Sequence, residues 1–319
     1  MSSVPPPASS DLSPDSGGAP PLLLGTSAFG QNERAFPVYD AYWEGGGRAF
    51  DTAWLYGHAY GPGCCERTFG AWARSRGVEK DVWVLAKGAH TPECLPDRVE
   101  AQLAESFDRM GRDDAALYML HRDNPDVPVG EFVSVLADLV ARGLISGYGM
   151  SNWSLGRVRE AVAYAREQGL PAPVGVSNQL SLIDMVQPIY PGTMGSHDPR
   201  WRAWLAENPV TLYPWASQGR GAHALADPAE LRTSPLAECW YSETNVERLH
   251  RARTLAERKG VSSTGIALAW TLSQPFRVVA LIGPRQPEEV RDSLAAAALR
   301  LTEAERDWLE NGAGEPPRD

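Results

Sequence analysis

The sequence predicts a single α/β domain, a (β/α)8 barrel of the TIM type with extra helices near the carboxyl end. Eight short apolar runs recur along the chain, most of them at intervals of roughly 25 to 38 residues. Amphipathic segments with helical spacing lie between the runs, as in repeated β-α units around a parallel sheet. The length of 319 residues and the hydrophobic content of 43% suit one barrel with a large core.

Each expected element has its own signal. The apolar runs begin near Leu22, Arg48, Val82, Ala115, Ile145, Pro173, Val210 and Val278. The expected helices each show one apolar face, such as Val99, Leu103, Phe107 and Met110, or Leu155, Val158, Val162 and Ala165. The expected N-caps are Asp97, Ser154 and Thr244, and the expected helix ends are at Gly77, Gly111, Gly143, Gly169 and Gly260.

An open, doubly wound sheet is the competing architecture. Sheets of that kind that bind dinucleotides carry a Gly-x-Gly-x-x-Gly turn directly after a strand. The sequence has no such turn after any expected strand, and Gly45-Gly46-Gly47 precedes a strand instead. The closed barrel is therefore favoured.

The chain divides into a barrel and two short ends. Residues 1–20 are rich in Pro, Ser, Gly and Asp, so we expect a disordered tail, followed by the barrel over 21–311 and a disordered end over 312–319. Two intervals, 184–199 and 216–243, are longer than the other connections. Long connections after barrel strands are candidates for a substrate lid.

Charge and composition narrow the class of partner. The formal net charge of -10 argues against nucleic acid and anionic membranes, because both would repel the protein. A small molecule is the expected partner. The sequence shows neither a long apolar span nor a basic-then-apolar start, so we expect a cytoplasmic protein. The four cysteines lack zinc spacing, and we expect reduced thiols and no metal site.

Polar side chains follow several expected strands at the point where each strand ends. Asp51, Lys87 and His121 stand at three of these ends, and Tyr56 lies close to the first. Singly, each has an ordinary structural explanation, such as a turn cap or a buried histidine. A barrel would bring them onto one rim, where they could transfer a proton to a developing alkoxide. A tyrosine has a pKa of about 10, and a neighbouring ammonium is expected to lower it.

Several motifs resemble those of the aldo-keto reductase family. They are Phe50-Asp51-Thr52-Ala53 with Tyr56-Gly57, Lys87-Gly88, Leu120-His121-Arg122, Gly149-Met150-Ser151-Asn152-Trp153, Asn178-Gln179, Leu281-Ile282-Gly283-Pro284-Arg285 and Pro287-Glu288-Glu289-Val290. The resemblance spans residues 22 to 311. It implies a (β/α)8 barrel and hydride transfer between nicotinamide C4 and a carbonyl carbon. In that mechanism Tyr56 is the general acid, Lys87 and Asp51 tune it, and His121 orients the carbonyl.

The resemblance also implies how a cofactor is held. Ser151, Asn152 and Gln179 match the residues that contact the nicotinamide carboxamide, and Tyr213 matches the aromatic residue that stacks on the ring. The residues that match the grip on the adenosine phosphate are Gly283, Arg285 and Glu289. Because a guanidinium suits a 2′-phosphate, NADPH is expected rather than NADH. Glu289 and Ser293 depart from the Gln and Asn that the family often has there.

The substrate is less defined. Trp54 and Trp153 are the expected walls of the substrate pocket, since aromatic faces pack on planar substrates and sugars. Some segments resemble a bacterial subgroup associated with sugar or polyol chemistry. We therefore expect an NADPH-dependent reductase of an aldehyde or ketone, such as a sugar or secondary-metabolite carbonyl, acting as a monomer or weak homo-oligomer. The alternatives are an alcohol or sugar dehydrogenase running oxidatively, and a nucleotide-sensing regulatory subunit with little turnover.

Overall fold

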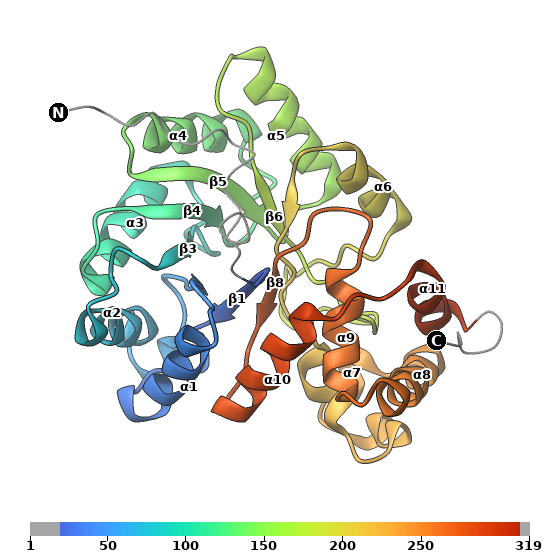
Figure 1. The fold of residues 1–319 in the computed structure, drawn as a ribbon. Helices are drawn as coiled ribbons and strands as arrows, with labels where there is room; N and C mark the ends of the chain where they lie inside the picture. Colours follow the sequence, from blue (N-terminus) through green and yellow to red (C-terminus); the bar gives the residue numbers. More distant parts are fainter. Residues whose placement is uncertain (1–19, 313–319) are drawn as a thin grey trace.

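The computed structural model describes residues 20–312. Apart from Pro20 and Gly312, the expected disordered ends lie outside the described residues. The strands converge in the middle of the molecule, with helices around them (Figure 1). They are β1 (Leu22–Gly25), β2 (Ala49–Asp51), β3 (Trp83–Gly88), β4 (Ala115–Leu120), β5 (Ile145–Ser151), β6 (Gly175–Ser177), β7 (Thr211–Leu212) and β8 (Ala280–Ile282). Each begins within two residues of its predicted start.

The strands form one parallel sheet that closes on itself. Their order is β7-β6-β5-β4-β3-β2-β1-β8, so β1 pairs with both β2 and β8. A parallel bridge between Leu212 and Val278 joins β7 to the segment that leads into β8, and the Val279 amide donates to the Leu212 carbonyl at 2.9 Å. The predicted (β/α)8 barrel is confirmed, and the open sheet is excluded.

Helices surround the barrel, and extra helices gather near the carboxyl end. The surrounding helices are α1 (Asn32–Glu44), α2 (Cys64–Arg76), α3 (Pro96–Met110), α4 (Val129–Ala141), α5 (Leu155–Glu167), α6 (Pro199–Glu207), α9 (Ser263–Leu272) and α10 (Pro287–Ala298). The additional elements are the 3-10 turns η3 (His58–Tyr60), η4 (Gly219–Ala224) and η5 (Pro228–Thr233), and helices α7 (Ala237–Trp240), α8 (Glu243–Lys259) and α11 (Glu303–Asn311).

Helix starts follow local chemistry, with two corrections to the expected caps. Ser154 caps α5 as predicted, because its side chain accepts from the Arg157 amide. Helix α3 begins at Pro96, so Asp97 lies in the first turn, where its charge suits the helix dipole. The cap of α8 is Ser242 rather than Thr244. A capping hydroxyl earlier in the chain displaced the expected residue.

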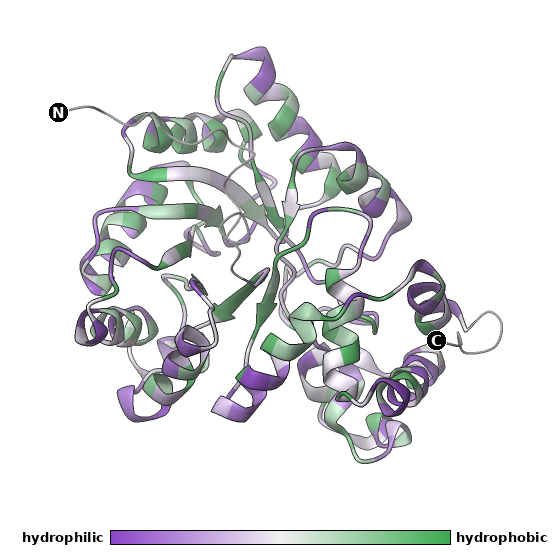
Figure 2. Cartoon of the chain, viewed as in Figure 1, coloured by the Kyte–Doolittle hydropathy of each residue, from purple (hydrophilic) through white to green (hydrophobic). Residues whose placement is uncertain are grey.

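The core of the barrel has two layers. Inside the barrel, side chains such as Leu23, Leu85, Met119 and Leu281 pack on one another. A larger cluster lies between the sheet and the helices. The central strands are accordingly hydrophobic, whereas several surrounding helices carry hydrophilic turns (Figure 2). Within residues 20–312, no helix combines the length and the apolar content needed to cross a bilayer.

Candidate active site

The polar residues predicted at strand ends meet on one rim of the barrel. Asp51 ends β2, Lys87 lies near the end of β3, His121 directly follows β4, and Ser151 ends β5. The four strands are consecutive neighbours in a parallel sheet, so their carboxyl ends face the same way. The barrel topology thus gathers residues that are far apart in the sequence.

Asp51, Tyr56 and Lys87 form one contact group. Lys87 Nζ forms an ion pair with Asp51 Oδ1, and both side chains are 2% exposed. The Tyr56 hydroxyl donates to Asp51 Oδ2 at 3.1 Å. Lys87 Nζ also lies 5.0 Å from the centroid of the Tyr56 ring. Asp51 therefore holds the ammonium and the phenol on its two carboxylate oxygens.

Burial opposes both charges of the Asp51–Lys87 pair. It raises the pKa of Asp51, although the Lys87 charge and hydrogen bond act in the other direction. It lowers the pKa of Lys87, again against the attraction of Asp51. Each charge is retained mainly because its partner is present, since an isolated buried charge is strongly unfavourable.

Tyr56 departs from its expected ionisation behaviour. Burial, followed by the charge and hydrogen bond of Asp51, raises its pKa well above the ordinary value, while the Arg122 charge acts against them. The expected lowering by Lys87 does not occur, because Asp51 stands between the ammonium and the phenol oxygen and neutralises the lysine. Tyr56 therefore carries its proton throughout the neutral range.

His121 is a neutral imidazole beside the phenol. Its ring meets that of Tyr56 edge-on, with centroids 5.6 Å apart, and meets that of His90 at 5.1 Å. Burial, then the charges of Lys87 and Arg122, lowers the pKa of His121 well below its ordinary value. Its Nδ1 is buried and has no hydrogen-bond partner among the described residues. A neutral imidazole offers one N–H donor, which suits a hydrogen bond to a carbonyl oxygen.

Asn152 connects the neighbouring segments at the rim. Its Nδ2 donates to the His121 carbonyl at 3.3 Å and to Ser151 Oγ at 3.0 Å. Its Oδ1 accepts from the Met194 amide at 3.1 Å and from Trp215 Nε1 at 3.2 Å. Its φ of 61° lies in the left-handed region, which asparagine tolerates better than most residues. The amide group is thus fully engaged within the protein.

Gln179, in contrast, keeps a free acceptor. Its Nε2 donates to Ser181 Oγ at 2.9 Å, while its buried Oε1 has no partner within residues 20–312. The Oδ1 of the adjacent Asn178 is also buried without a partner. Buried acceptors are nearly always satisfied in proteins, so these two oxygens point to a donor that a bound molecule would supply.

The structure places Tyr213, the expected stacking residue, inside the barrel. Tyr213 is 1% exposed and packs within the barrel interior, where its ring stacks on Trp83 at 6.3 Å. Trp83 begins β3, at the opposite end of the strand from Lys87. Trp215, two residues further on, reaches the rim and bonds to Asn152.

The two tryptophans expected in the substrate pocket both donate their indole N–H to other parts of the protein. Trp153 is completely buried, packs against Phe132 in the layer between sheet and helices, and donates to the Arg122 carbonyl at 3.1 Å. Trp54 is partly exposed, but its indole donates to Glu105 on α3 at 2.8 Å. Both indoles serve as anchors because an apolar ring with one N–H also suits such junctions.

The residues matched to the adenosine phosphate lie between β8 and α10. Gly283 is exposed, and a Cβ added there would meet nothing within 4 Å. Arg285 is exposed, and its guanidinium has no ion-pair partner in the described part of the chain. Glu289 accepts from the Arg285 amide at 2.6 Å, which places a carboxylate beside this opening. Ser293 is buried and accepts from Gln218 at 3.1 Å.

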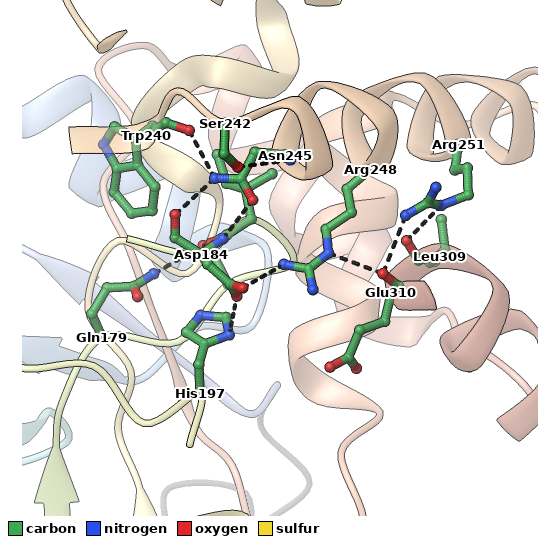
Figure 3. Close-up of polar contacts among 12 residues, drawn as sticks. Gln179, Asp184, His197, Trp240, Ser242, Asn245, Arg248, Arg251, Leu309 and Glu310 are labelled. Atoms are coloured by element: carbon green, nitrogen blue, oxygen red, sulfur yellow. Dashed lines mark hydrogen bonds and ion pairs between the residues drawn. The ribbon is translucent and has the colours of Figure 1, made fainter. Parts of the chain in front are cut away.

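One long connection, which we call the cover loop (residues 184–198), lies against this rim. It is tied to the barrel by a parallel bridge between Gln179 and Gly195. At its beginning, Asp184 pairs with Arg248 of α8 at 2.9 Å and with His197 at the other end of the loop (Figure 3). Asn245 also exchanges two hydrogen bonds with the Asp184 backbone. The two ends of the loop are therefore anchored.

The anchor extends to the last described helix. Arg248 Nε donates to the Glu310 carbonyl at 3.0 Å, and Arg251 donates to the carbonyls of Leu309 and Glu310 (Figure 3). Glu310 belongs to α11, which packs beside α8 (Figure 1). A continuous set of polar contacts thus joins the cover loop to α11.

Comparisons with known proteins agree with this architecture. The family model described as "Aldo/keto reductase family" matches residues 21–311. An uncharacterized oxidoreductase of Bacillus subtilis, YrpG, is 26% identical over 88% of each chain. Norsolorinic acid reductase stcV of Emericella nidulans is 28% identical over 89% of this chain and 76% of its own. An aldo/keto reductase from Klebsiella pneumoniae, solved with NADP and acetate, superposes with a TM-score of 0.70 at 20% identity, covering 94% of this chain and 93% of that one.

The family match covers nearly the entire described chain. The same segment carries the buried Asp51–Lys87 pair and the Tyr56 phenol at the rim of the barrel. The protein belongs to the aldo/keto reductase family of oxidoreductases.

Proposed function

We propose that the protein reduces an aldehyde or ketone to the alcohol, with NADPH as hydride donor and Tyr56 as proton donor. The observation that carries the proposal is the 3.1 Å contact between Tyr56 and Asp51, beside Lys87 and the ring of His121. Proton transfer to a carbonyl oxygen needs a protonated group held at a fixed position. Tyr56 meets both conditions.

Tyr56, Asp51, Lys87 and His121 have different roles at the carbonyl oxygen. When bound, a reduced nicotinamide supplies the hydride. The carbonyl oxygen then becomes more basic than a phenolate, so the protonated Tyr56 can give up its proton despite its raised pKa. Asp51 and Lys87 hold the phenol in place. The neutral His121 donates a hydrogen bond that orients the carbonyl and stabilises the developing charge.

The nicotinamide end of the cofactor fits the free groups near Gln179. The buried, unpartnered Oε1 of Gln179 can accept from the carboxamide NH2. Trp215, beside Asn152, supplies the aromatic face that we first expected from Tyr213. Asn152 and Ser151 must exchange one of their present bonds to contact the carboxamide directly. We therefore assign the ring contact to Trp215 and the first carboxamide contact to Gln179.

The adenosine end favours NADPH over NADH. The exposed guanidinium of Arg285 is available for a 2′-phosphate, and the open space at Gly283 allows a phosphate to approach the backbone. The Klebsiella relative solved with NADP supports the same choice. Glu289 weakens the site, because its carboxylate would repel a phosphate bound by Arg285.

The reductive direction follows from the choice of cofactor, since cells keep NADPH largely reduced. Two relatives named as an oxidoreductase and a reductase support the reaction class. Oxidation of an alcohol, and nucleotide sensing with little turnover, are the outcomes that would replace carbonyl reduction. We also propose that the protein is cytoplasmic and is a monomer or weak homo-oligomer.

The test is loss of the reduced-nicotinamide absorbance with purified protein and a panel of aldehydes, ketones and keto-sugars. Tyr56→Phe should lower kcat by about 100-fold to 10,000-fold, the usual contribution of a general acid, while cofactor binding is retained. Tyr60→Phe is the matched control, because Tyr60 is 73% exposed and four residues away. Full activity in Tyr56→Phe would overturn the proposal, and binding without turnover in either direction would favour sensing.

A further inference from the structure

Arg122 directly follows His121 and is a buried cation. It has no role in the reaction as proposed above. Its backbone carbonyl accepts from Trp153 Nε1 at 3.1 Å and from Cys94 Sγ at 3.2 Å. These two bonds come from segments after β5 and β3, so the backbone on which the side chain is mounted is fixed on both sides. The backbone that carries the guanidinium is therefore held in place at the rim.

The guanidinium is mostly unpaired. Arg122 is 6% exposed, and Nη1 donates only to the carbonyl of His121, at 2.9 Å. Its Nε is buried without a partner, and within residues 20–312 no carboxylate forms an ion pair with it. The nearest carboxylate in sequence, Asp123, is paired with Arg157 at 2.9 Å. A buried guanidinium normally has an anionic partner, because the unpaired charge is costly.

The Arg122 side chain also lies against the cover loop. A Cβ added to Gly192 of that loop would stand 3.6 Å from Arg122 Cδ and 3.8 Å from Nε. After burial, the Arg122 charge also contributes to lowering the pKa of His121 and of Lys87. Arg122 is thus within electrostatic reach of the groups around the carbonyl.

The charge balance of the site leaves one positive charge. Asp51 and Lys87 neutralise each other, and His121 is neutral. Burial also lowers the pKa of His90, so its ring is neutral as well. Arg122 therefore supplies a local positive charge in a protein whose formal net charge is -10. A local positive charge on a negatively charged protein attracts anions to that site rather than to the rest of the surface.

We propose that Arg122 binds an anionic oxygen group, a carboxylate or a phosphate, on the carbonyl substrate, so that the enzyme prefers acidic aldehydes or ketones. The proposal rests on the proposed carbonyl reduction. The substrate anion supplies the missing partner of the guanidinium, while the carbonyl reaches Tyr56 and His121. The terminal N–H groups of the guanidinium that are not bonded to the His121 carbonyl offer the donors that suit such oxygens.

The kinetic test compares matched substrates. Benzaldehyde is the neutral reference, 2-, 3- and 4-carboxybenzaldehyde vary the position of a carboxylate, and glyceraldehyde with and without a 3-phosphate gives the phosphate comparison. The measured quantity is the ratio of kcat/KM for the charged substrate to that for its neutral partner. The isomer with the highest ratio reports the distance between the anion site and the reacting carbonyl, and the two series distinguish carboxylate from phosphate.

Arg122→Met should lower this ratio by about 10-fold to 100-fold, the value of a hydrogen bond to a charged group, whatever it does to benzaldehyde itself. Arg122→Lys should restore part of the ratio, because it keeps the charge but loses the planar donor set. The control is Arg159→Met, an exposed arginine on α5, which should leave the ratio unchanged. Added salt should lower the ratio in the unmodified protein and have little effect in Arg122→Met.

The outcomes separate this proposal from the proposed function. If benzaldehyde is reduced in a Tyr56-dependent manner but the ratio is the same in Arg122→Met, the reductase stands and the anion site is wrong. If no carbonyl is reduced at all, benzoate and benzamide binding to the protein with NADP+ can be followed by tryptophan fluorescence. Selective loss of benzoate affinity in Arg122→Met would still support the anion site, and equal affinities would overturn it.

Discussion

Tyr56 and Asp51 share a hydrogen bond of 3.1 Å, and the same carboxylate holds Lys87 on its other oxygen. The Tyr56 hydroxyl is thus bonded directly to the negatively charged Asp51, whereas the positively charged Lys87 is bonded to the other oxygen of that carboxylate. Asp51→Asn should lower the pKa of Tyr56, because it removes the carboxylate that raises it together with burial. The alkaline loss of reductase activity should then move to lower pH. Profiles of kcat against pH would show this, and an unshifted alkaline limb would contradict it.

His121 should not titrate during catalysis in the neutral range. Burial, with the charges of Lys87 and Arg122, holds its pKa well below the ordinary value of about 6.5, so the imidazole is already neutral there. We expect kcat/KM for reduction to show no inflection near pH ~6.5. If an inflection appears, the variant His90→Gln tests whether the neighbouring ring causes it. An inflection lost only in His121→Gln would contradict the neutral assignment.

Trp215 and Tyr213 should differ in their effects on the cofactor. Trp215→Ala should weaken NADPH binding by about 3-fold to 10-fold through the lost aromatic contact. Trp215→Phe should weaken it less, because only the bond to Asn152 is lost. Tyr213→Phe, inside the barrel, is the matched control and should leave the affinity unchanged. Titration of the protein fluorescence measures all three, and a larger effect at Tyr213 would restore the first assignment.

The affinity for NADPH should depend on the charges of Arg285 and Glu289. Arg285→Ala should weaken NADPH by about 10-fold to 100-fold and NADH little, because only NADPH carries the 2′-phosphate. Glu289→Gln should tighten NADPH, since it removes a carboxylate next to the Arg285 amide. Dissociation constants for both cofactors provide the check. Equal losses for NADPH and NADH in Arg285→Ala would mean that the guanidinium does not meet the phosphate.

Asp184 should stabilise the folded protein at neutral pH and lose this contribution in acid. Burial alone would raise its pKa, but the bond and charge of His197 and the charge of Arg248 outweigh burial and lower it to about 2. A carboxyl with a depressed folded pKa stabilises the fold above its unfolded pKa and loses that contribution as pH falls toward the folded value. Because the side chain is 43% exposed, solvent screening reduces the contribution to about 1 kcal/mol.

The corresponding variant is Asp184→Asn. Its free energy of unfolding should fall by about 1 kcal/mol at pH 7, and the difference from the unmodified protein should shrink between pH ~4 and ~2. Urea denaturation at several pH values measures both quantities. Asp198→Asn is a control for a carboxylate on the same loop that does not reach α8, because its partner is Arg200. A difference that persists at pH ~2 would mean that the charge of Asp184 is not responsible.

The barrel could be predicted because it depends on local patterns. Apolar runs located the start of every strand, and Ser154 was identified as a cap from its position before a helical pattern. The proton-transfer side chains followed, because a parallel sheet places all its strand ends on one rim. Asp97 and Thr244 were misplaced as caps because several polar residues compete at each helix start.

The positions of the aromatic side chains could not be predicted from local patterns, because they depend on how the strands and helices pack in three dimensions. Tyr213 and Trp215 are two residues apart, so both point toward the barrel axis. Which of them reaches the rim is decided by the stagger of the strands, which the sequence does not reveal. Trp153 was expected in the pocket because aromatic faces pack on planar substrates and sugars, and its ring packs against Phe132 of α4. Arg122 was visible within its motif, but its lack of a carboxylate partner appears only when Asp123 is seen bound to Arg157.

The contacts that tie α11 to α8 have a practical consequence for handling the protein. Arg248 touches Glu310 with Nε and Asp184 with Nη1, so the tail of the last helix and the root of the cover loop share one side chain. A truncation that removed Glu310 would therefore remove a partner of both Arg248 and Arg251. A change at Glu310 would reach Asp184, at the start of the cover loop, through the side chain of Arg248.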